Sequence, residues 1–163
     1  MADNENAVEK RLSITKIYLK DSSFESPRSP EIFQQGDWKP QTNLNLRSSH
    51  NQLEGDIHEI VLTVTIEAKE EDKTCFLVEL QQAGLFQIAG YEGEELQAII
   101  GSFCPNILFP YARESIASLI QKGGFPEFVL QPINFDALYL QAKQQQMSEG
   151  TGDAETHLSL IHI

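Results

Sequence analysis

The most regular pattern in the chain is an alternation of apolar and polar residues over positions 57–68. The even positions form one apolar face, which comprises Ile60, Leu62, Val64 and Ile66. From position 59 to position 67 the odd positions are polar, with Val61 as the exception. Because neighbouring side chains of a β-strand point to opposite faces of a sheet, this alternation predicts a half-buried strand. Residues 41–47 alternate in the same way and predict a second strand of this kind.

Residues 74–82 predict a further strand, which the polar link at 69–73 joins to the strand before it. Its side chains divide between two faces, with Phe76, Val78 and Leu80 on one and Cys75, Leu77 and Glu79 on the other. The second face is unusually apolar for a sheet surface in contact with water. We therefore expect that something covers this face or binds to it transiently.

Two other segments are less regular. Residues 12–24 predict the first strand, whose phase slips at a bulge, and Pro27 and Pro30 follow it as a stop. Three glycines interrupt residues 83–93, so this segment predicts an extended crossover loop and not a strand.

Apolar residues at helical spacing begin near residue 94 and continue to Lys122, where Gly123 and Gly124 predict a C-terminal stop. Pro105 and Pro110 fall within this stretch. Proline can begin a helix or interrupt one, so the pattern leaves open whether the stretch forms one helix or two.

A last helix is expected from residue 134 to about residue 146. Asn134 is the predicted N-cap, and Ile133 and Leu138 are placed to form a hydrophobic staple. Residues 1–11 and 147–163 lack periodicity, which predicts disordered ends, although positions 158–163 are unexpectedly apolar. Residues 12–146 then form one domain. Strands precede helices along it, which predicts an α+β fold with the helices on one face of an antiparallel sheet.

The charge of the chain limits its partners. The 163 residues include 24 acidic and 12 basic side chains, a formal net charge of −12, and residues 54–95 carry −9 of it. An acidic surface argues against nucleic acid and anionic membranes and favours a net-positive polypeptide. The acidic region between 54 and 95 has two interpretations that the sequence leaves open: a solvated face, or a docking surface for a cationic partner.

No pattern of reactive side chains indicates catalysis or metal binding. Cys75 and Cys104 are far apart and lack CxxC spacing, so both are expected to be packing residues in a reducing compartment. The four histidines have no ligand-like partner four residues away, so neither a metal nor another cofactor is expected. No apolar run approaches the roughly 20 residues that span a bilayer. We expect a soluble cytoplasmic protein that is not an enzyme.

Many aromatic residues lie at the edges of predicted elements and in loops. They are Phe24, Phe33, Trp38, Phe86, Tyr91, Phe125, Phe128, Phe135 and Tyr139. Each of them could complete the core, but as a group they can line a groove for an extended peptide. We assign such a groove to Trp38, Phe86, Tyr91, Phe135 and Tyr139.

Several runs of residues closely resemble the SecB family of bacterial protein-export chaperones. They lie at 76–82, 88–90, 104–114 and 133–138, and the run Cys-Pro-Asn-Ile-Leu-Phe-Pro-Tyr-Ala-Arg at 104–113 is highly specific. The similarity extends from about residue 17, through Trp38, to the glutamines at 144–146. It therefore covers nearly all of the domain predicted above.

The resemblance implies a four-stranded antiparallel sheet with two main helices packed on one face, assembled as a homotetramer built from two dimers. It implies a chaperone that works without ATP, keeps unfolded precursor proteins competent for translocation, and delivers them to the translocation ATPase SecA. SecA would bring a short basic C-terminal tail that carries zinc, so the zinc would belong to SecA and not to this chain.

The resemblance also implies roles for particular residues. Asp21, Glu25, Leu77 and Glu79 would lie on the SecA-docking face. Val78, Leu80 and Gln82 match strand positions linked to assembly of the oligomer, and Trp38 would belong to the client groove. Leu77 and Glu79 also belong to the outer face of their strand, which is unusually apolar for a surface in contact with water.

Two points stay open. Tails of the family are usually polar and acidic to the end, whereas this chain ends in the apolar residues 158–163. An oligomeric α+β carrier of a small apolar ligand would also explain a groove lined by aromatic side chains, and it would require a closed cavity.

Overall fold

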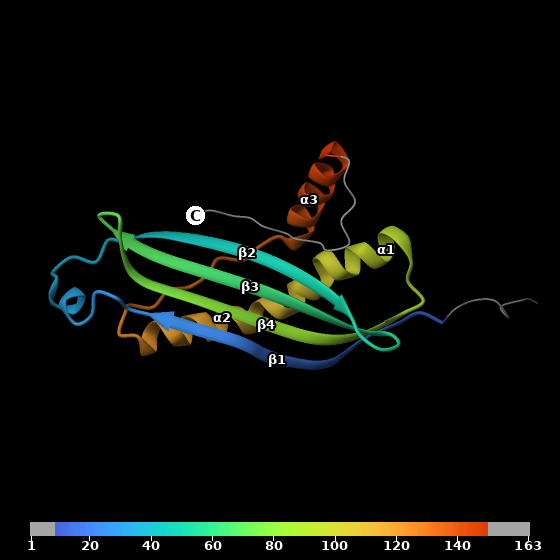
Figure 1. The fold of residues 1–163 in the computed structure, drawn as a ribbon, viewed down its shortest axis with the longest axis horizontal. Coiled ribbons are helices and arrows are strands. Elements are labelled where there is room, and N and C mark those ends of the chain that lie inside the picture. Colours follow the sequence, from blue (N-terminus) through green and yellow to red (C-terminus); the bar gives the residue numbers. More distant parts are fainter. Residues whose placement is uncertain (1–8, 150–163) are drawn as a thin grey trace, which may run out of the picture.

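The structure is a computed structural model that describes residues 9–149, with side chains described as far as Met147. Four strands form one antiparallel sheet in the order β1-β4-β3-β2. The strands are β1 (Arg11–Glu25), β2 (Gln41–Gln52), β3 (Ile57–Glu70) and β4 (Lys73–Ala89). Helix α2 (Cys104–Lys122) crosses one face of the sheet, and α3 (Phe135–Glu149) stands away from it (Figure 1). The predicted α+β class, sheet and pair of main helices are confirmed.

The core lies between the sheet and α2. The apolar even positions predicted for residues 60–66 and 76–80 are fully or almost fully buried on this side. The helix contributes buried residues four positions apart: Leu108, Ala112, Ile116 and Ile120. Side chains at this spacing share one face of an α-helix, so α2 presents a continuous apolar stripe to the sheet.

Strand β4 extends well beyond its predicted end, and the crossover loop predicted for 83–93 is wrong. Residues as far as Ala89 pair with β1, and residues as far as Gln87 pair with β3. Gly84 lies within the strand because α2 passes close to it: a Cβ atom there would lie 3.0 Å from the Leu108 side chain. The glycine therefore marks close packing of helix on sheet and not an interruption of the strand.

Strand β1 carries two irregularities, which confirm the predicted slip of phase. Its pairing with β4 shifts between Ile14 and Lys16 and again between Leu19 and Asp21. A bulge of this kind adds one unpaired residue and reverses which face the following side chains occupy.

The helical stretch after β4 is continuous. It runs through α1 (Gly93–Ala98), a π-helical turn (Ile99–Phe103) and α2, and Pro110 lies inside α2 on its exposed side. No helix among residues 9–149 is long and apolar enough to cross a membrane.

The predicted stop after Lys122 is confirmed. The N–H groups of Gly124 and Phe125 donate to the carbonyls of Gln121 and Ile120 at 3.0 and 3.2 Å. This is the hydrogen-bond pattern of a Schellman motif, and Gly124 has the positive φ of 92° that the motif requires.

Residues 125–134 then run in extended form to α3, with Phe125 and Leu130 buried against the core. Asn134 is the N-cap of α3, as predicted, because its Oδ1 accepts a hydrogen bond of 3.0 Å from the N–H of Ala137. The helix reaches Glu149, three residues past its expected end, and β1 already includes Arg11. The rest of the predicted disordered ends, residues 1–8 and 150–163, lies outside the described part of the chain.

Two histidines pair on the helix-facing side of β2 and β3. His50 Nε2 and His58 Nδ1 lie 2.7 Å apart, and the ring planes are inclined by only 17°. Burial lowers the pKa of both side chains, and in His50 the neighbouring His58 lowers the pKa further, whereas the nearby Asp56 acts in the opposite direction on His58.

We expect this pair to make the fold sensitive to acid. The unfolded chain binds protons at these histidines more readily than the folded chain does. Their contribution to stability is therefore complete above pH 6.5 and is lost as the pH falls below it. Urea unfolding between pH 7.5 and 5 measures this loss, and the His50→Phe/His58→Phe variant should show a shallower pH dependence. An unchanged slope in the variant would contradict the assignment.

Candidate functional site

The outer face of the sheet, opposite α2, carries the residues predicted for docking. Glu25 pairs directly with Leu77, Asp21 pairs with Gln81, and Glu79 pairs with Ser23 and Thr65. The register thus brings the four predicted residues onto one face of two neighbouring strands. Glu67 pairs with Leu77 from the other side and joins the group. We call this group the acidic outer patch: Asp21, Glu25, Glu67, Leu77 and Glu79.

The patch is an accessible apolar side chain surrounded by carboxylates. Asp21 and Glu25 are exposed, whereas Leu77, Glu67 and Glu79 are half-buried. Thr74 Oγ1 donates a hydrogen bond of 2.6 Å to Glu67, whose only ion pair among residues 9–149 is the 3.6 Å contact to Lys69. A surface of this composition suits a partner that offers cations around a small apolar group.

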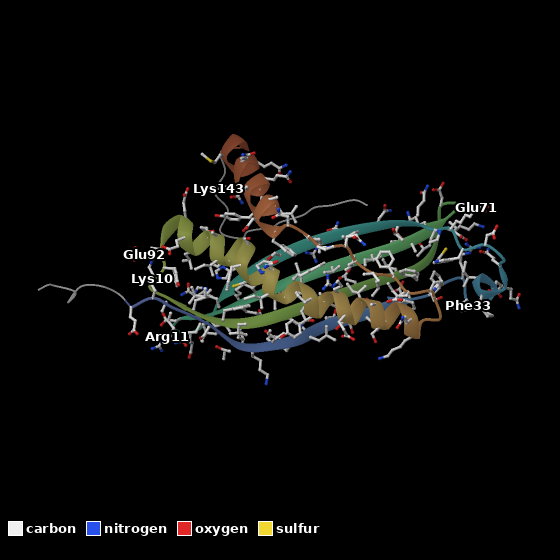
Figure 2. All side chains as sticks on the ribbon, turned by 180° about the vertical axis from the view of Figure 1, so that it is seen from behind. Lys10, Arg11, Phe33, Glu71, Glu92 and Lys143 are labelled. Carbon is white, nitrogen blue, oxygen red and sulfur yellow. The ribbon has the colours of Figure 1, made fainter. Side chains whose placement is uncertain are left out.

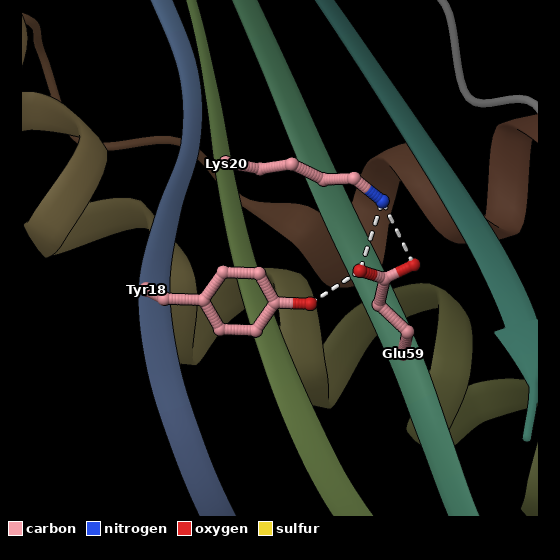
Figure 3. A network of polar contacts seen from close by, with 3 residues as sticks. All are labelled: Tyr18, Lys20 and Glu59. Carbon is pink, nitrogen blue, oxygen red and sulfur yellow. Dashed lines mark hydrogen bonds and ion pairs between the residues drawn. The ribbon is translucent and has the colours of Figure 1, made fainter.

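Next to the patch, three side chains form a polar cluster across the sheet. Lys20 Nζ lies 2.9 and 3.1 Å from the two carboxylate oxygens of Glu59, and the hydroxyl of Tyr18 donates a hydrogen bond to the same carboxylate (Figure 3). Tyr18 and Lys20 belong to β1 and Glu59 to β3, so both contacts reach over β4.

The cluster shifts the titration of its members. Burial raises the pKa of Tyr18 to about 12, and the hydrogen bond to Glu59 adds to this effect. Burial alone would raise the pKa of Glu59, but the hydrogen bonds from Tyr18 and Lys20 and the charge of Lys20 lower this pKa below its ordinary value. The Glu59 carboxylate is therefore ionised and paired at neutral pH.

The residues predicted to contact a second subunit lie inside this one. Val78 and Leu80 have no accessible surface and face α2, and Gln82 is almost fully buried. The Gln82 amide donates a 3.1 Å hydrogen bond to the carbonyl of Tyr18 and so ties β1 to β4. Even positions of β4 point into the core, so the link of these three residues to assembly stays a prediction, which would act through the packing of the subunit.

The predicted aromatic groove does not form as a single site. Phe86 is fully buried in the core, so its assignment to an accessible groove is wrong. Trp38 packs with Phe76 and Phe125, with ring centroids 6.4 and 5.2 Å away. Phe33 belongs to the same cluster, at the opposite end of the molecule from Lys10, which lies over the Tyr91 ring (Figure 2).

Tyr91 and Phe135 line a hollow of about 490 Å³ that is open to solvent. It lies between the helical stretch after β4 and the start of α3, and we call it the α1–α3 hollow. Its lining is apolar with a few polar groups: Leu12, Tyr91, Ile99, Phe103, Ile133 and Phe135, with Glu95, Ser102, Asn106 and Asp136.

Polar contacts fix the rim of the hollow. The Lys10 ammonium forms a 3.0 Å ion pair with Glu95, and the Ser102 hydroxyl donates a hydrogen bond to Asp136 at the start of α3. Tyr139 lies outside the hollow and packs on Gly101. An extended peptide with apolar side chains could enter such a space, whereas a carrier of a small apolar ligand needs a closed one.

The two cysteines are free and buried, as predicted for packing residues. Burial raises the pKa of the Cys104 thiol to about 12, which suppresses its reactive thiolate form at neutral pH. Among residues 9–149 no group of three or more His, Cys, Asp or Glu side chains is arranged to hold a metal ion.

Sequence reasoning missed Glu67, the Tyr18–Lys20–Glu59 cluster and the polar rim of the hollow. Tyr18 and Lys20 stand two positions apart on a predicted strand, a spacing that indicates a shared face. Their partner Glu59 lies 39 residues from Lys20, so only the strand register identifies it.

The fold defines the class of this protein. A solved SecB-like chaperone from Mycobacterium tuberculosis, in complex with a ChAD peptide from the HigA1 antitoxin, superposes with a TM-score of 0.63. The match covers 76% of this chain and 91% of that one, with 18% sequence identity. The chain therefore has the fold of a SecB-like chaperone.

The sequence places it within that class. Residues 5–146 match the family model of SecB, the preprotein translocase subunit. Protein-export protein SecB of Nitrosococcus oceani is 50% identical over 92% of each chain, and that of Marinobacter nauticus is 47% identical over 94% of this chain and 93% of its own. The chain belongs to the SecB family of protein-export chaperones.

Packing at Gly101 generates a test of how α3 is held. A Cβ atom there would lie 2.5 Å from the Tyr139 ring, so Gly101→Ala should lower the free energy of unfolding by about 1–3 kcal/mol. The loss would appear although alanine is the better helix former. Chemical unfolding measures it, and Gly36→Ala is the matched control because no atom lies within 4 Å of that site. A Gly101→Ala variant as stable as Gly36→Ala would refute the contact.

Proposed function

We propose that this protein holds unfolded precursor proteins in the cytoplasm without ATP, keeps them competent for translocation, and passes them to SecA. The observation that carries the proposal is the acidic outer patch. Residues assigned to docking from two distant segments lie side by side on the face that α2 leaves uncovered. The patch and the client-binding surfaces then occupy different parts of the subunit, so one molecule can engage both partners.

SecA would dock through its basic, zinc-bearing C-terminal tail. Asp21, Glu25 and Glu79 supply negative charge, and Leu77 supplies an apolar contact between them. Opposite charges speed the encounter and set the orientation of the complex. The zinc would stay with SecA, so docking of this kind needs no metal or other cofactor on this chain.

Clients would enter by apolar side chains. The α1–α3 hollow offers the partly exposed Tyr91, whereas Phe135, which also lines it, is almost fully buried. The cluster around Trp38 offers a second contact at the other end of the subunit. Each contact is weak, and several contacts along one polypeptide provide avidity without a sequence requirement. Separate sites suit a long unfolded chain better than a small apolar ligand.

Assembly into a homotetramer, as two dimers, would multiply these contacts. Large apolar side chains remain about half exposed on β1, the π-helical turn and α2, namely Ile14, Leu19, Phe103 and Tyr111. Strand β1 also has one unpaired edge. Apolar patches and free edges of this extent favour association with further copies.

Reversing one charge of the patch tests the docking assignment. Glu79→Lys should weaken binding of the isolated SecA tail at least about tenfold, equivalent to about 1.4 kcal/mol, while client capture is retained. Isothermal calorimetry measures the affinity. Glu54→Lys is the matched control, since it makes the same change of charge at an exposed turn at one end of the sheet. Equal affinities for the two variants would disprove docking at this face.

Client holding is tested by refolding. The protein should slow refolding of a denatured precursor in the absence of ATP, and Tyr91→Ala should reduce this effect several-fold because it removes apolar area from the hollow. Leu53→Ala, at an exposed turn, should leave holding unchanged. If Tyr91→Ala and Leu53→Ala hold the precursor equally well, the hollow is not a client site.

A further inference from the structure

The second bulge of β1 decides which side chains reach the acidic outer patch. Leu19 pairs with Gln82 and Asp21 pairs with Gln81, so Lys20 is an extra residue between them. Before the bulge, Tyr18 lies on the outer face opposite Ala83. In an unbroken strand Asp21 would follow Leu19 onto the helix side, because side chains two positions apart share a face.

Burial of Phe24 explains why a bulge is present. Phe24 pairs with Val78 on the helix side, and its ring packs against Phe76 and Phe125 with centroids 6.0 and 6.2 Å away. Without an extra residue between Leu19 and Phe24, this ring would point to the outer face and into water. The core therefore requires that the alternation of side chains between the two faces shift by one residue between Leu19 and Phe24.

Burial of Phe24 does not determine where the reversal occurs. An extra residue at Ser22 or Ser23 would bury the same ring and would leave Glu25 on the outer face. In those arrangements, however, Asp21 would lie on the helix side and would be lost from the patch. The face that Asp21 occupies thus depends on the exact residue that bulges, whereas Phe24 lies on the helix side in each case.

The cluster of Tyr18, Lys20 and Glu59 supplies the missing constraint. Both oxygens of the Glu59 carboxylate lie within 3.1 Å of Lys20, the bulged residue itself. The same carboxylate accepts the hydrogen bond of Tyr18, the last outward residue before the bulge. The Glu59 side chain is only 13% exposed and projects from β3, an inner strand of the sheet (Figure 3). It is therefore a rigid anchor for the edge strand β1.

We propose that Glu59 is a positioning residue for docking: it holds the bulge at Lys20 and thereby places the Asp21 carboxylate on the acidic outer patch. This inference rests on the proposed docking function of that patch. Glu59 need not touch the partner, because it acts through the backbone phase of β1.

The test removes the anchor without changing the net charge of the face. In the double variant Lys20→Met/Glu59→Leu, binding of the SecA tail should weaken by the same factor as in Asp21→Ala, about three- to tenfold. Adding Asp21→Ala to the double variant should cause no further loss, because both changes remove the same carboxylate from the patch. Adding Glu79→Lys should cause its full additional loss.

Two further measurements separate positioning from general damage to the fold. The charge-reversed pair Lys20→Glu/Glu59→Lys restores the ion pair and should recover at least half of the lost affinity. Cross-strand nuclear Overhauser contacts between Asp21 and Gln81 should be present in the wild type and weakened in the double variant. Circular dichroism confirms that each variant is folded.

Each outcome bears on the inference. Wild-type affinity in the double variant, with a clear loss in Asp21→Ala, overturns it, and so does an undiminished Asp21–Gln81 contact in the double variant. If the contact is lost but Asp21→Ala binds normally, Glu59 does position the bulge and the docking role of Asp21 fails instead.

Discussion

The packing of α2 on the even positions of β3 and β4 is the constraint on which the rest of the structure depends. It buries these even positions almost completely, and because strand side chains alternate strictly, it commits every odd position of β4 to the opposite face. Leu77 and Glu79 reach the surface for this reason, and Val78 and Leu80 cannot. The acidic outer patch is therefore a consequence of how the core is packed on the other side.

Strand β1 joins the patch under a weaker constraint. As an edge strand it pairs only with β4. The positions of its two bulges determine which face of the sheet each of its side chains occupies. The aromatic packing of Phe24 and the polar cluster at Glu59 act on opposite faces of the sheet. Together they select one arrangement of the β1 side chains. The Gln82 amide adds a bond from the helix side to the carbonyl of Tyr18. The side chains of this edge strand that are proposed for docking therefore have fixed positions on the outer face.

The surfaces proposed for client binding depend on where the remaining aromatic residues lie. Aromatic residues outside the main stripes divide between a packed cluster near Trp38 and an open hollow near Tyr91. Phe86 looked equivalent to them in sequence, but β4 continues through it and buries it. Glycines in the same segment suggested a loop because composition does not reveal that Gly84 provides room for α2.

Local pattern alone determined the fold class, the faces of β2 and β3, the buried face of β4, the caps at Asn134 and Gly124, and the acidic character of the sheet half. These follow from periodicity and backbone preference, which act between residues close in sequence. Resemblance to a family then supplied the residues proposed for docking. Only the tertiary structure decided which residues meet across strands, where β4 ends, that Val78, Leu80 and Gln82 are internal, and that Glu59 reaches Lys20. Those outcomes depend on strand register and helix approach, and both are set by contacts between residues far apart in the chain.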